Sequence, residues 1–203
     1  MTTDRIISKR EGAVGYITFN NPERRTAMSL EMWEAAGEIM AKFKADPDIR
    51  VVVMHGAGDK AFVSGADISQ FEKQRSDAAA TERYNQRAEA GRSAIRDFDR
   101  PIIAMIRGFC MGGGLGIAMS ADLRFAAEGS TFGIPAARLS IAYVGDNITN
   151  LYNLVGPSRA KDILYSARRL DAQEALSIGL INRVFTPETR YAETRADCEV
   201  LAD

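Results

Sequence analysis

The chain has 203 residues, of which 46% are hydrophobic and 26% charged, and its formal net charge is −1. This length suits one domain with a sizeable core, and the near-neutral charge gives no electrostatic reason to expect nucleic acid or an anionic membrane as a partner. No apolar run approaches the length of a bilayer span, and the first residues lack a signal-peptide hydrophobic region, so we expect a cytoplasmic protein. Cys110 and Cys198 match no metal or redox spacing, and we expect no metal site.

Short apolar strands alternate with helices along the sequence, which indicates the α/β class. Strands are expected at residues 14–19, 51–54, 61–63, 102–106, 123–127, 131–135 and 180–185. Helices are expected at residues 30–44 after Ser29 as N-cap, 76–98, from the glycines at 112–114 onward, 146–154, 156–167 and 172–178. Residues 187–203 are polar and helix-prone, with no evident surface to pack on.

The most informative stretch is PIIAMIRGFCMGGGLG, residues 101–116, in which a strand runs through glycines into a helix. Glycines let a ligand approach peptide N–H groups closely, and the first N–H groups of a helix lack intrahelical partners. The helix dipole also favours negative charge there. The pattern therefore predicts a site for a negatively charged group at Gly112–Gly114, with a tight packing turn as the structural alternative.

A second glycine pattern, Gly56-x-Gly58-x-x-Ala61, formally matches a dinucleotide fingerprint. That fingerprint requires a helix directly after it, whereas Ala61-Phe62-Val63 reads as extended. We therefore keep a dinucleotide oxidoreductase only as a weak alternative.

Five segments in order resemble the crotonase, or enoyl-CoA hydratase/isomerase, superfamily over essentially the whole chain. They are Asn21-Pro22 through Leu30, AFVSGADISQF, PIIAMIRGFCMGGGLGIAMSADLRFA, TFGIPAARL and LDAQEALSIGLINRV. The resemblance implies a ββα superhelix that binds acyl-CoA thioesters, with coenzyme A as part of the substrate and no separate cofactor. It also implies that the N–H groups of Ala66 and Gly113 form an oxyanion hole that stabilises a thioester enolate.

The resemblance further implies which residues contact coenzyme A or substrate. They are Arg24, Arg25, Ala66, Asp67, Ile68, Gly112, Gly113 and Ala136. For the two arginines, a solvated loop is an equally good interpretation.

The chain departs from the hydratase pattern at both glutamate positions, where it has Gly116 and Ala136. Because both glutamates are absent, we expect a pocket without acidic side chains. An oxyanion hole alone cannot move protons, so we expect decarboxylase-like or other non-hydratase chemistry. Tyr143 aligns with a tyrosine of family decarboxylases, and Asp146 is a candidate base. The alternatives are a hydratase that uses Asp146 and an inactive acyl-CoA-binding homologue.

Each candidate also has a purely structural interpretation. Tyr143 can be a core tyrosine with its hydroxyl at the surface, and Asp146 can be a helix N-cap. Asp122 is expected to cap or fix a turn, and His55 to be structural at the end of a buried strand.

Members of the family usually continue into a C-terminal helical region that covers the CoA site. We therefore expect residues 1–185 to form the acyl-CoA-binding core and residues 186–203 to begin that region, which is truncated or missing here. A homotrimer or hexamer is expected if the full C-terminal region is present.

Overall fold

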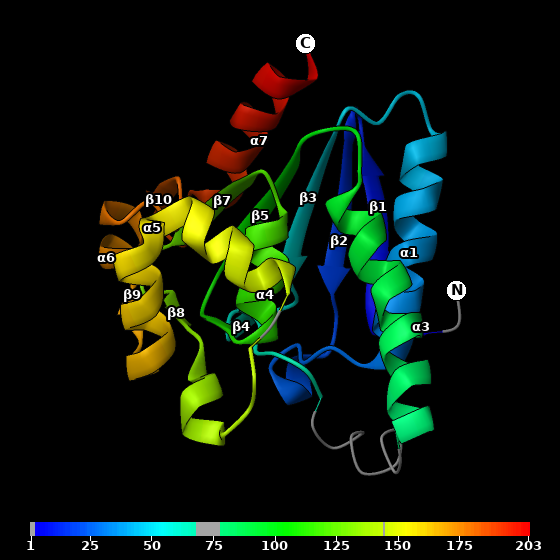
Figure 1. The fold of residues 1–203 in the computed structure, drawn as a ribbon. Helices are drawn as coiled ribbons and strands as arrows, with labels where there is room; N and C mark the ends of the chain where they lie inside the picture. The colour runs from blue at the N-terminus through cyan, green and yellow to red at the C-terminus, as the bar shows by residue number, and fades with distance from the viewer. Residues whose placement is uncertain (1–2, 68–77, 144) are drawn as a thin grey trace.

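The computed structural model describes residues 3–67, 78–143 and 145–203, which form two β-sheets flanked by helices (Figure 1). The larger sheet contains β1 (Ile6–Glu11), β2 (Val14–Phe19), β3 (Val51–Gly56), β5 (Ile102–Ile106), β7 (Leu123–Ala127) and β10 (Arg183–Phe185), in that spatial order. The smaller sheet contains β4 (Ala61–Val63), β6 (Phe109–Met111), β8 (Thr131–Gly133) and β9 (Leu170–Asp171). The helices are η1 (Pro22–Arg24), α1 (Leu30–Ala45), α3 (Ala78–Arg96), α4 (Gly113–Ser120), η3 (Pro135–Leu139), α5 (Asp146–Ser166), α6 (Ala172–Ser177) and α7 (Arg190–Ala202).

The chain alternates between the two sheets. Strands β3, β5 and β7 lie side by side in the larger sheet, and each is followed by a strand of the smaller sheet, β4, β6 and β8. Helices α3, α4 and α5 follow these pairs in turn. The pairings are parallel except for β1–β2 and β8–β9, which are antiparallel. This order is the ββα superhelix that the resemblance implies.

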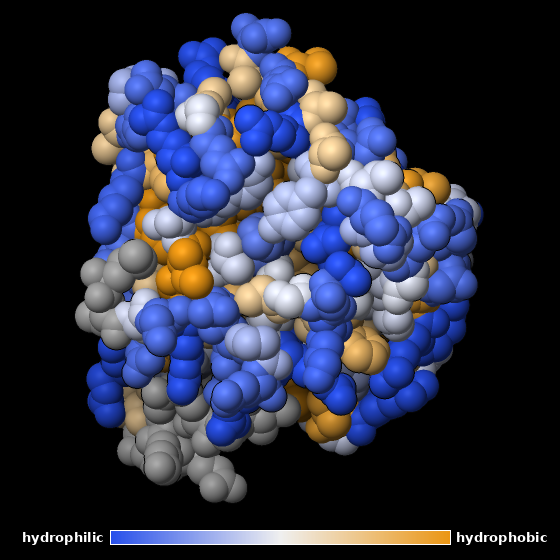
Figure 2. Space-filling view, turned by 180° about the vertical axis from the view of Figure 1, so that it is seen from behind, coloured by the Kyte–Doolittle hydropathy of each residue, from blue (hydrophilic) through white to orange (hydrophobic). Residues whose placement is uncertain are grey.

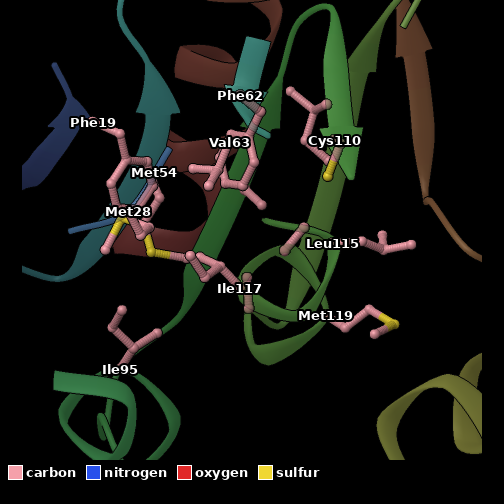
Figure 3. Close-up of a cluster of buried hydrophobic side chains, with 14 of the residues drawn as sticks. Phe19, Met28, Met54, Phe62, Val63, Ile95, Cys110, Leu115, Ile117 and Met119 are labelled. Carbon is pink, nitrogen blue, oxygen red and sulfur yellow. The ribbon is translucent and has the colours of Figure 1, made fainter. Parts of the chain in front are cut away.

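The main hydrophobic core lies between the larger sheet, the smaller sheet and helices α1, α3 and α4. Figure 3 shows part of it, with Met28, Ile95 from α3 and Ile117 from α4 pointing into the same apolar space. These three side chains are at most 4% exposed. Helices α3 and α4 are thus fixed against the sheet by apolar contacts, which stabilise the fold in proportion to the area removed from water.

Helix α7 has a packing surface that the sequence did not reveal. Its Cys198 is fully buried in a second cluster, with Val53 of β3 and Phe125 of β7, on the other face of the larger sheet. The expectation that residues 187–203 have nothing to pack on is therefore wrong. Hydrophilic residues cover most of the face seen in Figure 2, and hydrophobic atoms show between them in smaller patches.

Most expected elements are present. Strands β1, β6 and β9 and the short helices η1 and η3 were not expected, and β8 and β10 are shorter than expected. The two helices expected at 146–154 and 156–167 are present as the two parts of α5, separated by a kink at Gly156, whose dihedral angles are not helical. No helix within 3–67, 78–143 or 145–203 combines the length and the apolar character needed to cross a membrane.

Candidate active site

The glycine corner places the N-terminus of α4 against the smaller sheet. Gly112 precedes the helix with φ +53°, a conformation that favours glycine, and its N–H donates to the Gly133 carbonyl at 2.8 Å. A side chain at Gly114 would overlap the Val63 carbonyl oxygen of β4. Glycine at this position therefore lets α4 approach β4 and the residues that follow it.

Ala66 lies just beyond β4 in a parallel bridge with Met28. The Met28 N–H donates to the Gly65 carbonyl at 2.8 Å, and the Asp67 N–H donates to the Met28 carbonyl at 2.9 Å. Successive peptide groups of an extended segment point to opposite sides. The N–H of Ala66 is therefore turned away from Met28, toward α4.

The N–H groups of Ala66 and Gly113 come close to each other at this corner. A Cβ built on Gly113 would lie 3.9 Å from the Ala66 nitrogen, and one built on Gly65 would lie 3.9 Å from the Gly113 nitrogen. Among the hydrogen bonds between described residues, neither N–H has an acceptor. Gly113 is also the first residue of α4, where the helix dipole is positive. The pair can donate two hydrogen bonds to one oxygen atom.

A cleft of about 580 Å³ opens beside these N–H groups. Of the residues that the sequence singles out, Ala66, Gly113, Gly116, Tyr143 and Asp146 line it. The other lining residues come mainly from α3, with further ones from α1, α4, the start of α5 and the segments between elements: Met28, Trp33, Gly65, Tyr84, Asn85, Glu89, Arg92, Ile95, Arg96, Ile117, Ser120, Ala142, Gly145, Asn147 and Asn150.

The cleft contains carboxylates, so the expectation of a pocket without acidic side chains is wrong. Glu89 lies 3.2 Å from Arg96 and 3.4 Å from Arg92, and Asp146 lies 2.8 Å from Arg96. The two carboxylates and two guanidinium groups join α3 to the start of α5. Arg92 also stacks over the Trp33 ring, 5.1 Å from its centroid.

Tyr143 points into the site rather than to the outer surface. Its hydroxyl donates to the Gly112 carbonyl at 3.3 Å, directly before the first N–H of α4. Burial raises the pKa of the Tyr143 phenol well above its ordinary value, so the hydroxyl keeps its proton. It can therefore donate a hydrogen bond to a substrate oxygen.

Asp146 is not the N-cap of α5, contrary to the structural interpretation of the sequence. The N-cap is Gly145, Asp146 is the first helical residue, and no side chain caps this terminus. Its carboxylate turns to Arg96 and is 68% exposed.

Of the expected CoA-binding residues, Ala66 and Gly113 line the cleft, whereas the others that the structure describes do not. Arg24 pairs at 3.3 Å with Asp67, whose side chain is 5% exposed. Arg25 stacks on the Phe109 ring, 5.3 Å from its centroid, and lines a separate hollow of about 320 Å³. Ala136 packs against the main core. Gly112 is outside the lining, with its carbonyl bonded to Tyr143, and Ile68 lies outside the described residues.

The remaining candidates have structural contacts. Asp122 accepts the Ile102 N–H at 2.8 Å, so its role is structural, although it fixes the start of β5 rather than a turn. His55 lies in β3, 3.0 Å from Thr18 of β2. The stretch after Gly58 continues into β4 and not into a helix, which removes the dinucleotide interpretation. Over the parts of the chain that the structure describes, no three His, Cys, Asp or Glu side chains are grouped to hold a metal ion.

The side of the cleft formed by α3 was not predicted from the sequence. Asn85, Glu89, Arg92 and Arg96 were not among the candidate site residues. Their spacing of four, three and four residues places them on one side of a helix, and that periodicity was the available signal.

Comparisons with known proteins identify the family of the chain. The sequence model of the family described as Enoyl-CoA hydratase/isomerase matches residues 9–203. The chain is 33% identical over 190 residues to a short-chain-enoyl-CoA hydratase of Clostridium acetobutylicum, covering 92% of this chain and 71% of that protein. It is 32% identical over 195 residues to a carnitinyl-CoA dehydratase of Citrobacter koseri, covering 96% and 73%.

Solved structures of enoyl-CoA hydratases also superpose closely on the chain. The crystal structure of an enoyl-CoA hydratase/carnithine racemase from Magnetospirillum magneticum superposes with a TM-score of 0.94 at 35% identity, covering 99% of this chain and 75% of that one. An enoyl-CoA hydratase from Bacillus anthracis superposes with a TM-score of 0.92 at 27% identity, covering 98% and 77%. The superhelix, the glycine corner and these matches together establish that the chain belongs to the enoyl-CoA hydratase/isomerase (crotonase) superfamily.

Proposed function

We propose that the chain is a lyase that binds an acyl-CoA thioester with its carbonyl oxygen between the N–H groups of Ala66 and Gly113. The observation that carries this proposal is the approach of these two N–H groups, without acceptors among the described residues, at the wall of the cleft. Such donors stabilise the negative charge of an enolate by about 3 kcal/mol each. Coenzyme A enters as part of the substrate, and no further cofactor is needed.

Decarboxylation of a malonyl-type thioester is the reaction that fits the side chains best. Gly116 and Ala136 leave the two glutamate positions without a carboxylate, and decarboxylation needs no base. The bond between the α-carbon and the carboxylate breaks, its electron pair forms the enolate, and CO₂ leaves. Water then protonates the α-carbon.

Tyr143 and Arg92 supply hydrogen-bond donors for the substrate carboxylate. The bond from the Tyr143 hydroxyl to Gly112 is long, at 3.3 Å, so the hydroxyl can exchange it for the shorter bond that a carboxylate accepts. Arg92 has a single ion-pair contact, at 3.4 Å to Glu89, among the described residues. Its remaining N–H groups can face a bound anion.

Hydration of an enoyl thioester is the second candidate, because Glu89 lines the cleft and the relatives include hydratases. A hydratase needs a carboxylate that reaches substrate and water. Both oxygens of Glu89 face arginines, and its side chain is 49% exposed, which suits an ion pair better than proton transfer.

Turnover of three thioesters separates these reactions. The purified protein is incubated with malonyl-CoA, methylmalonyl-CoA and crotonyl-CoA while CO₂ release and the conjugated-thioester absorbance are followed. Decarboxylation predicts CO₂ from a malonyl-type substrate and stable crotonyl-CoA. Loss of crotonyl-CoA that is abolished by Glu89→Gln would favour hydration, and binding of all three without turnover would indicate an inactive homologue.

A further inference from the structure

We propose that Asn147 is a catalytic residue whose carboxamide contacts the acyl part of the substrate in the space left by Gly116. This inference deepens the proposed function and rests on it in one respect, because the thioester must bind at Ala66 and Gly113. It concerns a residue of α5 that the glycine motifs of the sequence do not include.

The carboxamide occupies the place of the absent side chain at position 116. A Cβ built on Gly116 would lie 2.7 Å from Asn147 Oδ1, 2.9 Å from Cγ and 3.0 Å from Nδ2. Since all three atoms are similarly close, the amide group lies across the surface of α4 at this point. A side chain on residue 116 and the present position of Asn147 are therefore incompatible.

This place is next to the pair of N–H groups. Gly116 follows Gly113 by three residues on α4, so the two positions lie on the same face of the helix. Both line the cleft, as does Asn147. A thioester held at Gly113 would thus present its acyl carbons toward the carboxamide.

The carboxamide has hydrogen-bonding capacity to spare. Asn147 is half-buried, and within the described parts of the chain its side chain has no hydrogen-bond partner. An amide offers two donors and an acceptor but does not exchange a proton near neutral pH. Asn147 therefore cannot replace a glutamate as acid or base, and it is suited to hold an oxygen atom beside the α-carbon, such as that of a substrate carboxylate.

The main experiment measures turnover of malonyl-type thioesters by Asn147→Ala. We expect kcat to fall about 10- to 100-fold, the effect of losing one hydrogen bond to a charged group, while calorimetric affinity for free CoA stays unchanged. Asn147→Asp should lose more, because its charge repels the carboxylate. Asn153→Ala, an exposed asparagine of α5 outside the cleft, should match the wild type. Wild-type kcat in Asn147→Ala would overturn the inference.

A second experiment tests the shared space without any turnover. In Gly116→Glu the Asn147 side chain must rotate away from the new Cβ, so the thermal midpoint should fall, and Gly116→Glu combined with Asn147→Ala should lose less than the sum of the two single variants. Strictly additive losses would contradict the assignment of one space to both side chains. If the wild type turns over no thioester, the proposed reaction fails, whereas this non-additivity still decides where Asn147 lies.

Discussion

Gly91 on α3 meets the backbone of Trp33 on α1 with no room for a side chain between them. A Cβ built on Gly91 would overlap the Trp33 carbonyl oxygen and lie 2.8 Å from its carbonyl carbon. The two helices cross at this point, and the same helix α3 carries Glu89, Arg92 and Arg96 into the cleft. The distance between α1 and α3 thus sets the position of one side of the site.

Replacing Gly91 by alanine should therefore destabilise the protein and disturb the cleft. Backbone atoms must move to admit the methyl group, which costs about 1–3 kcal/mol. Gly37→Ala is the matched control on α1, because its Cβ would make ordinary contacts at 3.6 Å or more and alanine favours the helix. Urea denaturation of the two variants checks this, and equal stabilities would show that the helices separate without cost.

Gly113→Pro should remove one of the two N–H donors without breaking α4. Proline is tolerated at the first position of a helix, where Gly113 lies, and it has no N–H. We expect thioester turnover to fall about 10²- to 10³-fold. Gly113→Ala keeps the N–H, and its Cβ would have 3.9 Å to its nearest neighbours, so it should retain most activity. Similar rates for the proline and alanine variants would exclude the N–H as a donor.

Tyr143→Phe should lower kcat of a malonyl-type thioester about tenfold, the effect of losing one hydrogen bond. Burial raises the pKa of the phenol, so the hydroxyl remains protonated and wild-type activity should show no inflection from this group between about pH 7 and 9. Tyr165→Phe, at a side chain that is 74% exposed on α5, is the control. A phenylalanine variant with the wild-type rate and pH profile would assign Tyr143 to packing alone.

The sequence predicted the scaffold well because its signals are local. Apolar runs such as the one in β5 predict buried parallel strands, and Ser29 marks the start of α1 by accepting the Met32 N–H. The glycine corner was also visible, since consecutive glycines before an apolar helix are rare without a steric reason. Strand β6 was missed because three residues between Gly108 and Gly112 carry too little pattern.

The composition of the cleft could not be predicted in the same way. It depends on how α3 and α5 meet, and that contact joins Arg96 to Asp146 across fifty positions of sequence. The position of Asn147 could not be predicted from the sequence, because it depends on the contact between its carboxamide and the backbone of Gly116 in the folded protein. The sequence motifs predict that Gly116 and Ala136 stand at the two glutamate positions, whereas the presence of Glu89 in the cleft required the structure.

His55 connects the N-terminal part of the larger sheet to α7. Its Nε2 lies 3.0 Å from the Thr18 hydroxyl of β2 and 3.2 Å from the Tyr191 hydroxyl of α7. Its Nδ1 lies 3.2 Å from the Gly56 carbonyl. Burial lowers the pKa of the imidazole, and the nearby Arg190 lowers it further, against the opposing effect of the Gly56 carbonyl.

Acid should therefore weaken the fold through His55. Above the ordinary histidine pKa of about 6.5 the imidazole is neutral in both states, so it adds no pH dependence there. Below that value the unfolded chain binds a proton at His55 that the folded chain does not yet bind. The free energy of unfolding therefore decreases as the pH is lowered, until the pH is below the pKa of His55 in the folded protein. His55 is the single histidine of the chain, so His55→Gln should flatten the denaturation profile between about pH 7 and 5. Identical slopes for the two proteins would mean that α7 packs on the sheet independently of this imidazole.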